Sequence, residues 1–260
     1  MRYQVRPLSF GEILDESFKV LKDHFVTLVG ICAALYVPFT IVSALVVPAT
    51  EPGVPKPPSL AALGPTLITT LIFLSLFPLT QLAVTRAVAA AYLDTPMTPG
   101  EAYRGSIKLY GGYAATLLVS GIAIFGASML LVLPGIYFAV CWALVGPIFV
   151  IEGLRGRAAM RRSRSLMKGY WWRTAGVYVL IGLINGLVVA GVQTVLGAVP
   201  ILGPALSGVV QSVSTAYAEI TLVVLYVELR CRVEDFDLQR LANEVAASLP
   251  PPAAVPVPEI

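Results

Sequence analysis

The stretch RGRAAMRRSRSLMKGYWWR, residues 155–173, separates two long apolar runs and determines how the rest of the chain is interpreted. It holds seven bases in nineteen residues, with three consecutive aromatic residues near its end. Bases this dense beside apolar segments are typical of the cytosolic side of a membrane protein. The composition agrees, because 57% of the residues are hydrophobic and 13% are charged, against roughly a quarter charged in soluble domains. The sequence therefore predicts an integral membrane protein.

Outward from this stretch, the chain divides into six apolar runs, and a transmembrane helix takes about 20 such residues. The shortest run is the fourth, which makes it the least typical span. The runs are 25–47, 63–91, 111–133, 136–151, 172–198 and 204–227.

The Lys and Arg residues predict the orientation of these six helices. Seventeen of the eighteen lie before the first run, after the last run, or in and around alternate gaps, and Lys56 alone lies in the other gaps. By the positive-inside rule, the gaps rich in bases are cytosolic. We therefore expect a multi-pass protein of the cytoplasmic membrane with both termini in the cytosol.

The cytosolic gaps carry helix signals of their own. Ser9 and Glu12 form a capping box ahead of an amphipathic segment, and Thr98, Pro99 and Glu101 repeat that signature. The basic stretch follows the same plan more weakly. We expect an all-α fold of three hairpins, each preceded by an interfacial amphipathic helix at about 9–24, 99–110 and 157–169. The alternative is that any three interfacial helices look alike without being repeats.

The domain organisation is simple. Residues 1–249 form one six-helix membrane domain, and residues 250–260, with five prolines, are predicted to be a disordered tail. The three cysteines lie in apolar spans or in a basic stretch, so we expect no disulfide. We expect no cofactor and no metal site, since the only histidine is His24.

Three segments together resemble the bacterial membrane-domain family named after glycerophosphoryl diester phosphodiesterase. They are RPLSFGEILD (6–15), EG (152–153) with AMRRSRSLMKGYWWR (159–173), and LYVELRCRVEDFDL (225–238). The resemblance implies a bacterial inner membrane and a lipid-related setting. Some members also carry a soluble phosphodiesterase domain with histidines and a metal, which this sequence does not contain. No hydrolase activity is therefore implied.

Two ionisable residues fall inside apolar runs, Arg86 in the second and Glu219 in the sixth. An intramembrane charge is a functional hypothesis by default, because it costs on the order of 3 kcal/mol at the helix centre. The two residues are predicted at matching depths, so one hypothesis pairs them across the bundle. In the other, Arg86 extends to the interface while Glu219 is protonated or forms a hydrogen bond with a neighbour such as Gln81 or Tyr217.

The basic stretch supplies the candidates for binding lipid headgroups. Anionic lipids attract bases near the membrane surface, and the aromatic residues are typical of headgroup level. The alternative is that the bases only set the topology. The segment 228–237 is predicted to extend the last helix and to form salt bridges with these bases. The headgroup-binding candidates are Arg157, Arg161, Arg162, Arg164, Lys168 and Arg173.

Three functions fit these features to different degrees. The first is a non-enzymatic membrane protein that organises or binds lipid headgroups, anionic ones above all, or a membrane partner or a second copy of itself. The alternative is a transporter or channel for a small polar or lipid-derived solute that uses Arg86 and Glu219. An intramembrane hydrolase fits least, because the spans offer Ser and Thr but no His. Nucleic acid is excluded as a partner, since the bases abut the membrane.

Overall fold

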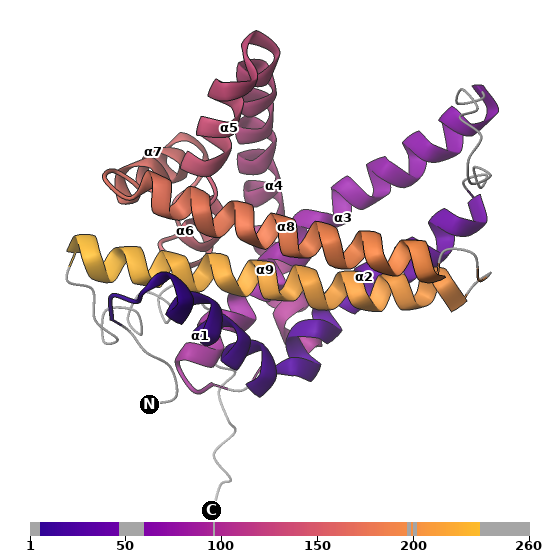
Figure 1. The fold of residues 1–260 in the computed structure, drawn as a ribbon, viewed down its shortest axis with the longest axis horizontal. Helices are drawn as coiled ribbons and strands as arrows, with labels where there is room; N and C mark the ends of the chain where they lie inside the picture. The colour runs from indigo at the N-terminus through magenta and orange to yellow at the C-terminus, as the bar shows by residue number, and fades with distance from the viewer. Residues whose placement is uncertain (1–5, 47–59, 96, 197–198, 200–201, 235–260) are drawn as a thin grey trace, which may run out of the picture.

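The protein is described by a computed structural model over residues 6–46, 60–95, 97–196, 199 and 202–234. Within these residues the fold is all-α, with nine helices and no strand (Figure 1). The tail predicted at 250–260 lies outside them. The helices are α1 (Phe10–Asp23), α2 (Phe25–Val46), α3 (Leu60–Tyr92), α4 (Pro99–Leu130), α5 (Val132–Cys141), α6 (Val145–Ile151), α7 (Gly156–Leu166), α8 (Trp171–Leu196) and α9 (Leu202–Glu234).

Six helical segments of the described chain are long and apolar enough to cross a membrane. They correspond one by one to the six apolar runs of the sequence, so the prediction of a multi-pass membrane protein is confirmed at this level. The segments are Phe25–Val46, Leu63–Tyr92, Pro99–Leu130, Val132–Ile151, Trp171–Val192 and Leu202–Glu234.

Both capping boxes are present. Ser9 accepts a hydrogen bond from the backbone N–H of Glu12, whose carboxylate accepts one from the N–H of Ser9 in return. Thr98 and Glu101 form the same reciprocal pair at the start of α4, with Pro99 as the first helical residue. Each box satisfies amide groups that a helix N-terminus otherwise leaves without a partner, which fixes where α1 and α4 begin.

The core of the molecule lies at one end of the long helices, in a region that we call the base. Every residue of α3 from Leu82 to Tyr92 is buried, as is every residue of α9 from Val223 to Cys231. A helix buried on all sides needs neighbours all around it. The neighbours are α1, α6 and α7 with the adjoining ends of α2, α4 and α8.

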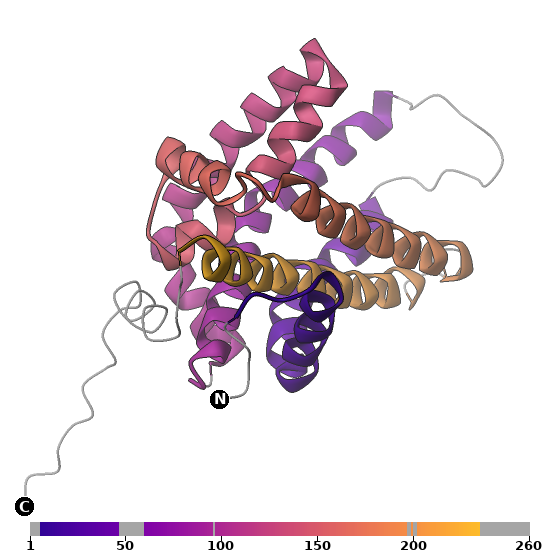
Figure 2. The same ribbon diagram turned by 60° about the vertical axis from the view of Figure 1, so that its left-hand side comes forward.

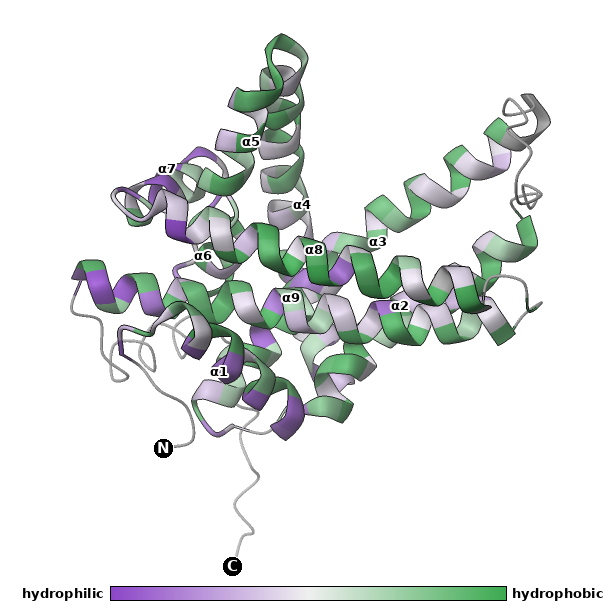
Figure 3. Ribbon diagram, viewed as in Figure 1, coloured by the Kyte–Doolittle hydropathy of each residue, from purple (hydrophilic) through white to green (hydrophobic). Residues whose placement is uncertain are grey.

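Beyond the base, the helices continue in pairs that leave in different directions (Figures 1 and 2). α4 is paired with α5 and α8 with α9, while α2 packs mainly against α9 and also contacts α3. Their surfaces are largely apolar, whereas the hydrophilic residues gather on α7, on α1 and at the C-terminal end of α9 (Figure 3). Charge is therefore concentrated at the base and absent from much of the paired helices.

Two helix boundaries differ from those expected from the sequence. The segment 99–110, expected as a separate helix, is the first part of α4 and runs without a break to Leu130. The fourth apolar run, expected as one helix, is divided into α5 and α6 by a turn at residues 142–144. The hydroxyl of Ser163 in α7 donates to the carbonyl of Cys141 at this break, at 2.7 Å. A side chain from another element thus takes up a helix-end carbonyl, which hydropathy alone does not reveal.

Candidate functional site

The short helix α7 presents its bases on one face. Three bases of α7 recur at spacings of four and three residues, which places them on the same side of the helix, and Lys168 follows in the turn after α7; all four are exposed. The opposite side of α7 is buried in the base through Ala159, Met160, Ser163 and Leu166. The exposed bases are Arg157, Arg161, Arg164 and Lys168.

Three of these bases line a pocket, which we call the basic pocket. Its volume is about 470 Å³, which is within the range of small-molecule sites. Two helices and the turn that leads into α8 contribute to its wall. The lining residues are Tyr137, Cys141, Arg161, Arg164, Ser165, Met167, Lys168, Gly169 and Trp171. The turn depends on Gly169, whose φ of 90° is readily adopted only by glycine.

Aromatic rings form one side of the basic pocket. Trp171 stacks on Tyr137 with 5.7 Å between the ring centroids and 23° between the planes. Trp172 packs edge-on against Trp171 and is 83% exposed. Tyrosine and tryptophan favour the headgroup level of a bilayer, because the ring is apolar and its N–H or O–H is polar. The pocket thus combines three cations with an aromatic wall.

Arg162 differs from the exposed bases of the basic pocket, because it forms hydrogen bonds with carboxylates of other helices. Arg162 donates to both carboxylate oxygens of Glu152, at 3.0 and 2.7 Å, and binds Glu234 at the end of α9 with two nitrogens. The hydrogen bonds from Arg162 to Glu234 and to Glu152 raise the pKa of its guanidinium further above its usual value, although burial opposes the shift. Arg162 therefore joins α7 to α6 and α9.

Arg173 is also engaged within the protein. It donates to the backbone carbonyl of Leu8 and to Glu228 of α9, the latter at 3.2 Å. Arg232 binds the same carboxylate and donates to Leu8 at 2.7 Å. The prediction that the end of the last helix forms salt bridges with the basic stretch is confirmed by these contacts. Of the six predicted headgroup-binding residues, Arg162 and Arg173 are thus structural, and the other four face outward.

Arg86 and Glu219 are both buried, at 4% and 8% exposed, but they do not form an ion pair in the described structure. Glu219 instead accepts a hydrogen bond of 2.7 Å from the side-chain amide of Gln81. Tyr113 donates to the carbonyl oxygen of that amide at 3.1 Å. Gln81 and Arg86 are five residues apart on α3, which turns them about 140° from each other at 100° per residue. A residue that faces Gln81 is therefore not on the face of Arg86.

The guanidinium of Arg86 lies against Gly105 of α4. A methyl group added at Gly105 would lie 2.6 Å from one of its terminal nitrogens, so the absence of a side chain makes room for it. No described residue forms a hydrogen bond or an ion pair with Arg86, and its buried Nε has no partner. The largely buried guanidinium thus has no counter-ion among the described residues, and burial of its Nε without a partner carries a desolvation cost.

The sequence did not reveal several residues of these sites. Tyr137 and Cys141 come from an apolar run, and nothing in their spacing connects them to α7. Tyr113 is likewise one polar residue in a long apolar helix. Among the described residues, no three side chains of the His, Cys, Asp or Glu type gather closely enough to hold a metal ion.

Comparison with known proteins gives one match. Residues 107–234, just under half of the chain, match a family described as a domain of unknown function, DUF8558. The matched region includes the basic pocket and Glu219 but not Arg86. Neither the curated proteins nor the solved structures contain a match.

Proposed function

We propose that this protein is a non-enzymatic integral protein of a bacterial inner membrane that binds anionic lipid headgroups in the basic pocket. One observation carries the proposal. Arg161, Arg164 and Lys168 converge beside the stacked rings of Tyr137 and Trp171, and no described carboxylate lies within ion-pair distance of them. The three cations of such a site can bind a phosphate group, and its aromatic wall can contact the adjoining glycerol and acyl region of the lipid.

The same proposal includes the arrangement in the membrane. The three helix pairs are hairpins that enter from the cytosolic side, and α1 and α7 lie at the interface with the base between them. The position of the bases supports this orientation, since those of the described chain gather on the base and not on the paired helices. The resemblance to the glycerophosphodiester phosphodiesterase membrane-domain family fits a lipid-related role.

The test compares two triple variants of the full-length protein. The pocket variant replaces Arg161, Arg164 and Lys168 with Gln, and the control variant replaces three exposed bases outside the pocket, Arg104, Lys108 and Arg157. Each variant loses the same charge, so a general electrostatic effect changes both equally. Native mass spectrometry of the purified proteins counts the lipids that each one retains from mixed phosphatidylglycerol and phosphatidylcholine.

We expect the wild type and the control variant to retain phosphatidylglycerol in preference to phosphatidylcholine. The pocket variant should bind it roughly a hundredfold more weakly, at about 1 kcal/mol for each base removed. Equal retention by the two variants would contradict the proposal. Titration with inorganic phosphate separates the two sources of a phosphate group. A wild type that takes up free phosphate but no lipid has a solute site, and the lipid assignment is then wrong.

A further inference from the structure

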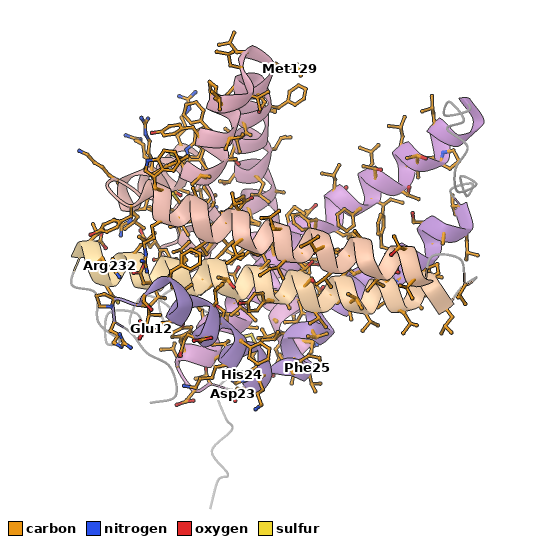
Figure 4. The ribbon with its side chains drawn as sticks, viewed as in Figure 1. Glu12, Asp23, His24, Phe25, Met129 and Arg232 are labelled. Carbon is orange, nitrogen blue, oxygen red and sulfur yellow. The ribbon has the colours of Figure 1, made fainter. Side chains whose placement is uncertain are left out.

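The α4–α5 pair ends in an apolar tip that stands apart from the other helices (Figures 1 and 2). No charged residue occurs between Gly121 and Trp142, and the side chains at the tip are strongly exposed, at 72% for Met129 and 78% for Leu133. Met129 lies at the far end of this pair from the base, whereas Glu12 and Arg232 lie at the base (Figure 4). The tip therefore needs an apolar environment.

The α4–α5 pair extends only a short distance beyond the basic pocket. The helix α5 has ten residues, which extend about 15 Å at 1.5 Å per residue. It ends at Cys141, which lines the basic pocket and binds Ser163 of α7. The hydrocarbon core of a bilayer is about 30 Å thick. The distance from the basic pocket to the tip thus covers only about half of it.

The bases of the pocket fix the level of this pair in the membrane. If the tip reached the far surface, Arg161, Arg164 and Lys168 would lie about 15 Å deep, near the centre of the hydrocarbon. Each would then carry a large desolvation cost, because a charged side chain is unfavourable at the centre of the bilayer. With the three bases and Trp171 at the headgroup level, each of these three charges is in a polar environment, and the tip lies no deeper than about the bilayer midplane. The second arrangement is strongly favoured.

We infer that the α4–α5 pair is a re-entrant hairpin whose partner is the acyl region of a single leaflet, the leaflet whose headgroups reach the basic pocket. The α8–α9 pair leaves the base in another direction (Figures 1 and 2), and α8, with 26 residues from Trp171, is long enough to cross the whole core even when it is tilted. The inference deepens the proposed function and rests on it only in placing the pocket at the headgroup level. The α4–α5 hairpin would then occupy the acyl region of one leaflet without crossing the bilayer.

Within the hairpin, the two helices pack too closely to open easily. A methyl group added at Gly135 of α5 would lie 1.9 Å from the hydroxyl of Ser128 in α4 and 3.0 Å from its Cα. The backbones therefore approach each other as in other pairs of membrane helices with small residues at the contact. A hairpin of this kind enters the leaflet as one unit.

The test places single cysteines at three positions of the full-length protein. The natural cysteines Cys32, Cys141 and Cys231 are buried, so an added exposed thiol reacts first. The variants are Met129→Cys at the tip, Leu202→Cys at the far end of the α8–α9 pair and Ala158→Cys on α7. A maleimide that does not cross membranes is applied to spheroplasts and, separately, to inverted vesicles. Solubilised protein gives the full extent of labelling.

We expect Ala158→Cys to be labelled in inverted vesicles and Leu202→Cys in spheroplasts. Met129→Cys should stay unlabelled in both and react only after solubilisation. A nitroxide at Met129→Cys in phosphatidylcholine vesicles should then report a depth of about 15 Å from its access to oxygen rather than to a nickel chelate. If Met129→Cys does not fold, Leu133→Cys serves the same purpose.

Labelling of the tip in spheroplasts means that the hairpin crosses the membrane, and labelling in inverted vesicles means that it stays in water. Either result overturns the inference. The measurement does not depend on an anionic lipid. A protein that shows the expected depth but retains no phosphatidylglycerol therefore disproves the proposed function alone, and the converse result disproves the re-entrant hairpin alone.

Discussion

The amide nitrogen of Gln81 in α3 lies 2.7 Å from a carboxylate oxygen of Glu219 in α9, although 138 residues separate them in the chain. This contact gives the buried carboxylate a neutral hydrogen-bond donor, as in the second of the two hypotheses from the sequence, and not the arginine of the first. It joins two of the helices that form the base, and Tyr113 of α4 extends it to a third.

The hydrogen bond between Gln81 and Glu219 predicts strong coupling in a double-mutant cycle. We expect Gln81→Leu and Glu219→Leu to interact by about 1–3 kcal/mol in thermal unfolding in detergent, because either single change leaves a buried polar group without its partner. The matched cycle of Arg86→Leu with Glu219→Leu should show coupling below about 0.5 kcal/mol. If the cycle of Arg86 with Glu219 gave the larger coupling energy, the hypothesis that these two residues form a pair would be supported instead.

The unpartnered guanidinium of Arg86 predicts that its removal is tolerated. The variant Arg86→Met keeps most of the side-chain volume and removes a buried charge that no described residue compensates. We expect the midpoint of thermal unfolding to stay the same or to rise, by the equivalent of about 1 kcal/mol. Arg86→Ala is the control, since it removes the charge but also leaves a cavity. A large loss of stability in Arg86→Met would mean that the guanidinium has a partner in the native membrane.

The carboxylates around Arg162 predict that this arginine, unlike its exposed neighbours, stabilises the fold. In Arg162→Met, Glu152 and Glu234 lose the cation between them, which should lower the free energy of unfolding by about 2 kcal/mol. Arg157→Met, on the exposed side of the same helix, should change it by less than about 0.5 kcal/mol. Thermal melting of the purified variants in detergent measures both effects, and equal losses would argue against the network.

The capping box of α1 predicts a dependence on acid pH. The backbone N–H of Ser9 and the guanidinium of Arg6 hold the pKa of Glu12 at about 2, below its ordinary 4.5. Because the folded pKa is lowered, the stabilisation by the carboxylate is complete above pH 4.5 and is lost as the pH falls towards 2. The difference in melting midpoint between the wild type and Glu12→Gln should therefore be constant above pH 5 and shrink through this window. A difference that persists unchanged at pH 2 would contradict the low pKa.

Local features of the sequence predicted the helices well. The apolar runs and the two capping boxes depend on residues within a few positions of one another, and the structure places helices and caps there. The continuation of the last helix as a charged segment was also predicted, from the alternation of acids and bases there, and the structure pairs Glu228 and Glu234 with arginines of the basic stretch. The break between α5 and α6 was not, since the hydroxyl that takes up the carbonyl of Cys141 belongs to a helix 22 residues away.

The sequence by itself determined that this is an all-α membrane protein with its charges in alternate gaps, since hydrophobicity and charge act on each segment separately. Only the tertiary structure decided which polar groups meet. It turned Glu219 towards Gln81 and away from Arg86, it used Arg162 and Arg173 within the base, and it brought Tyr137 next to Trp171. These choices depend on how far each helix is rotated and on where it ends relative to its neighbours. Packing sets both, and no single segment encodes them.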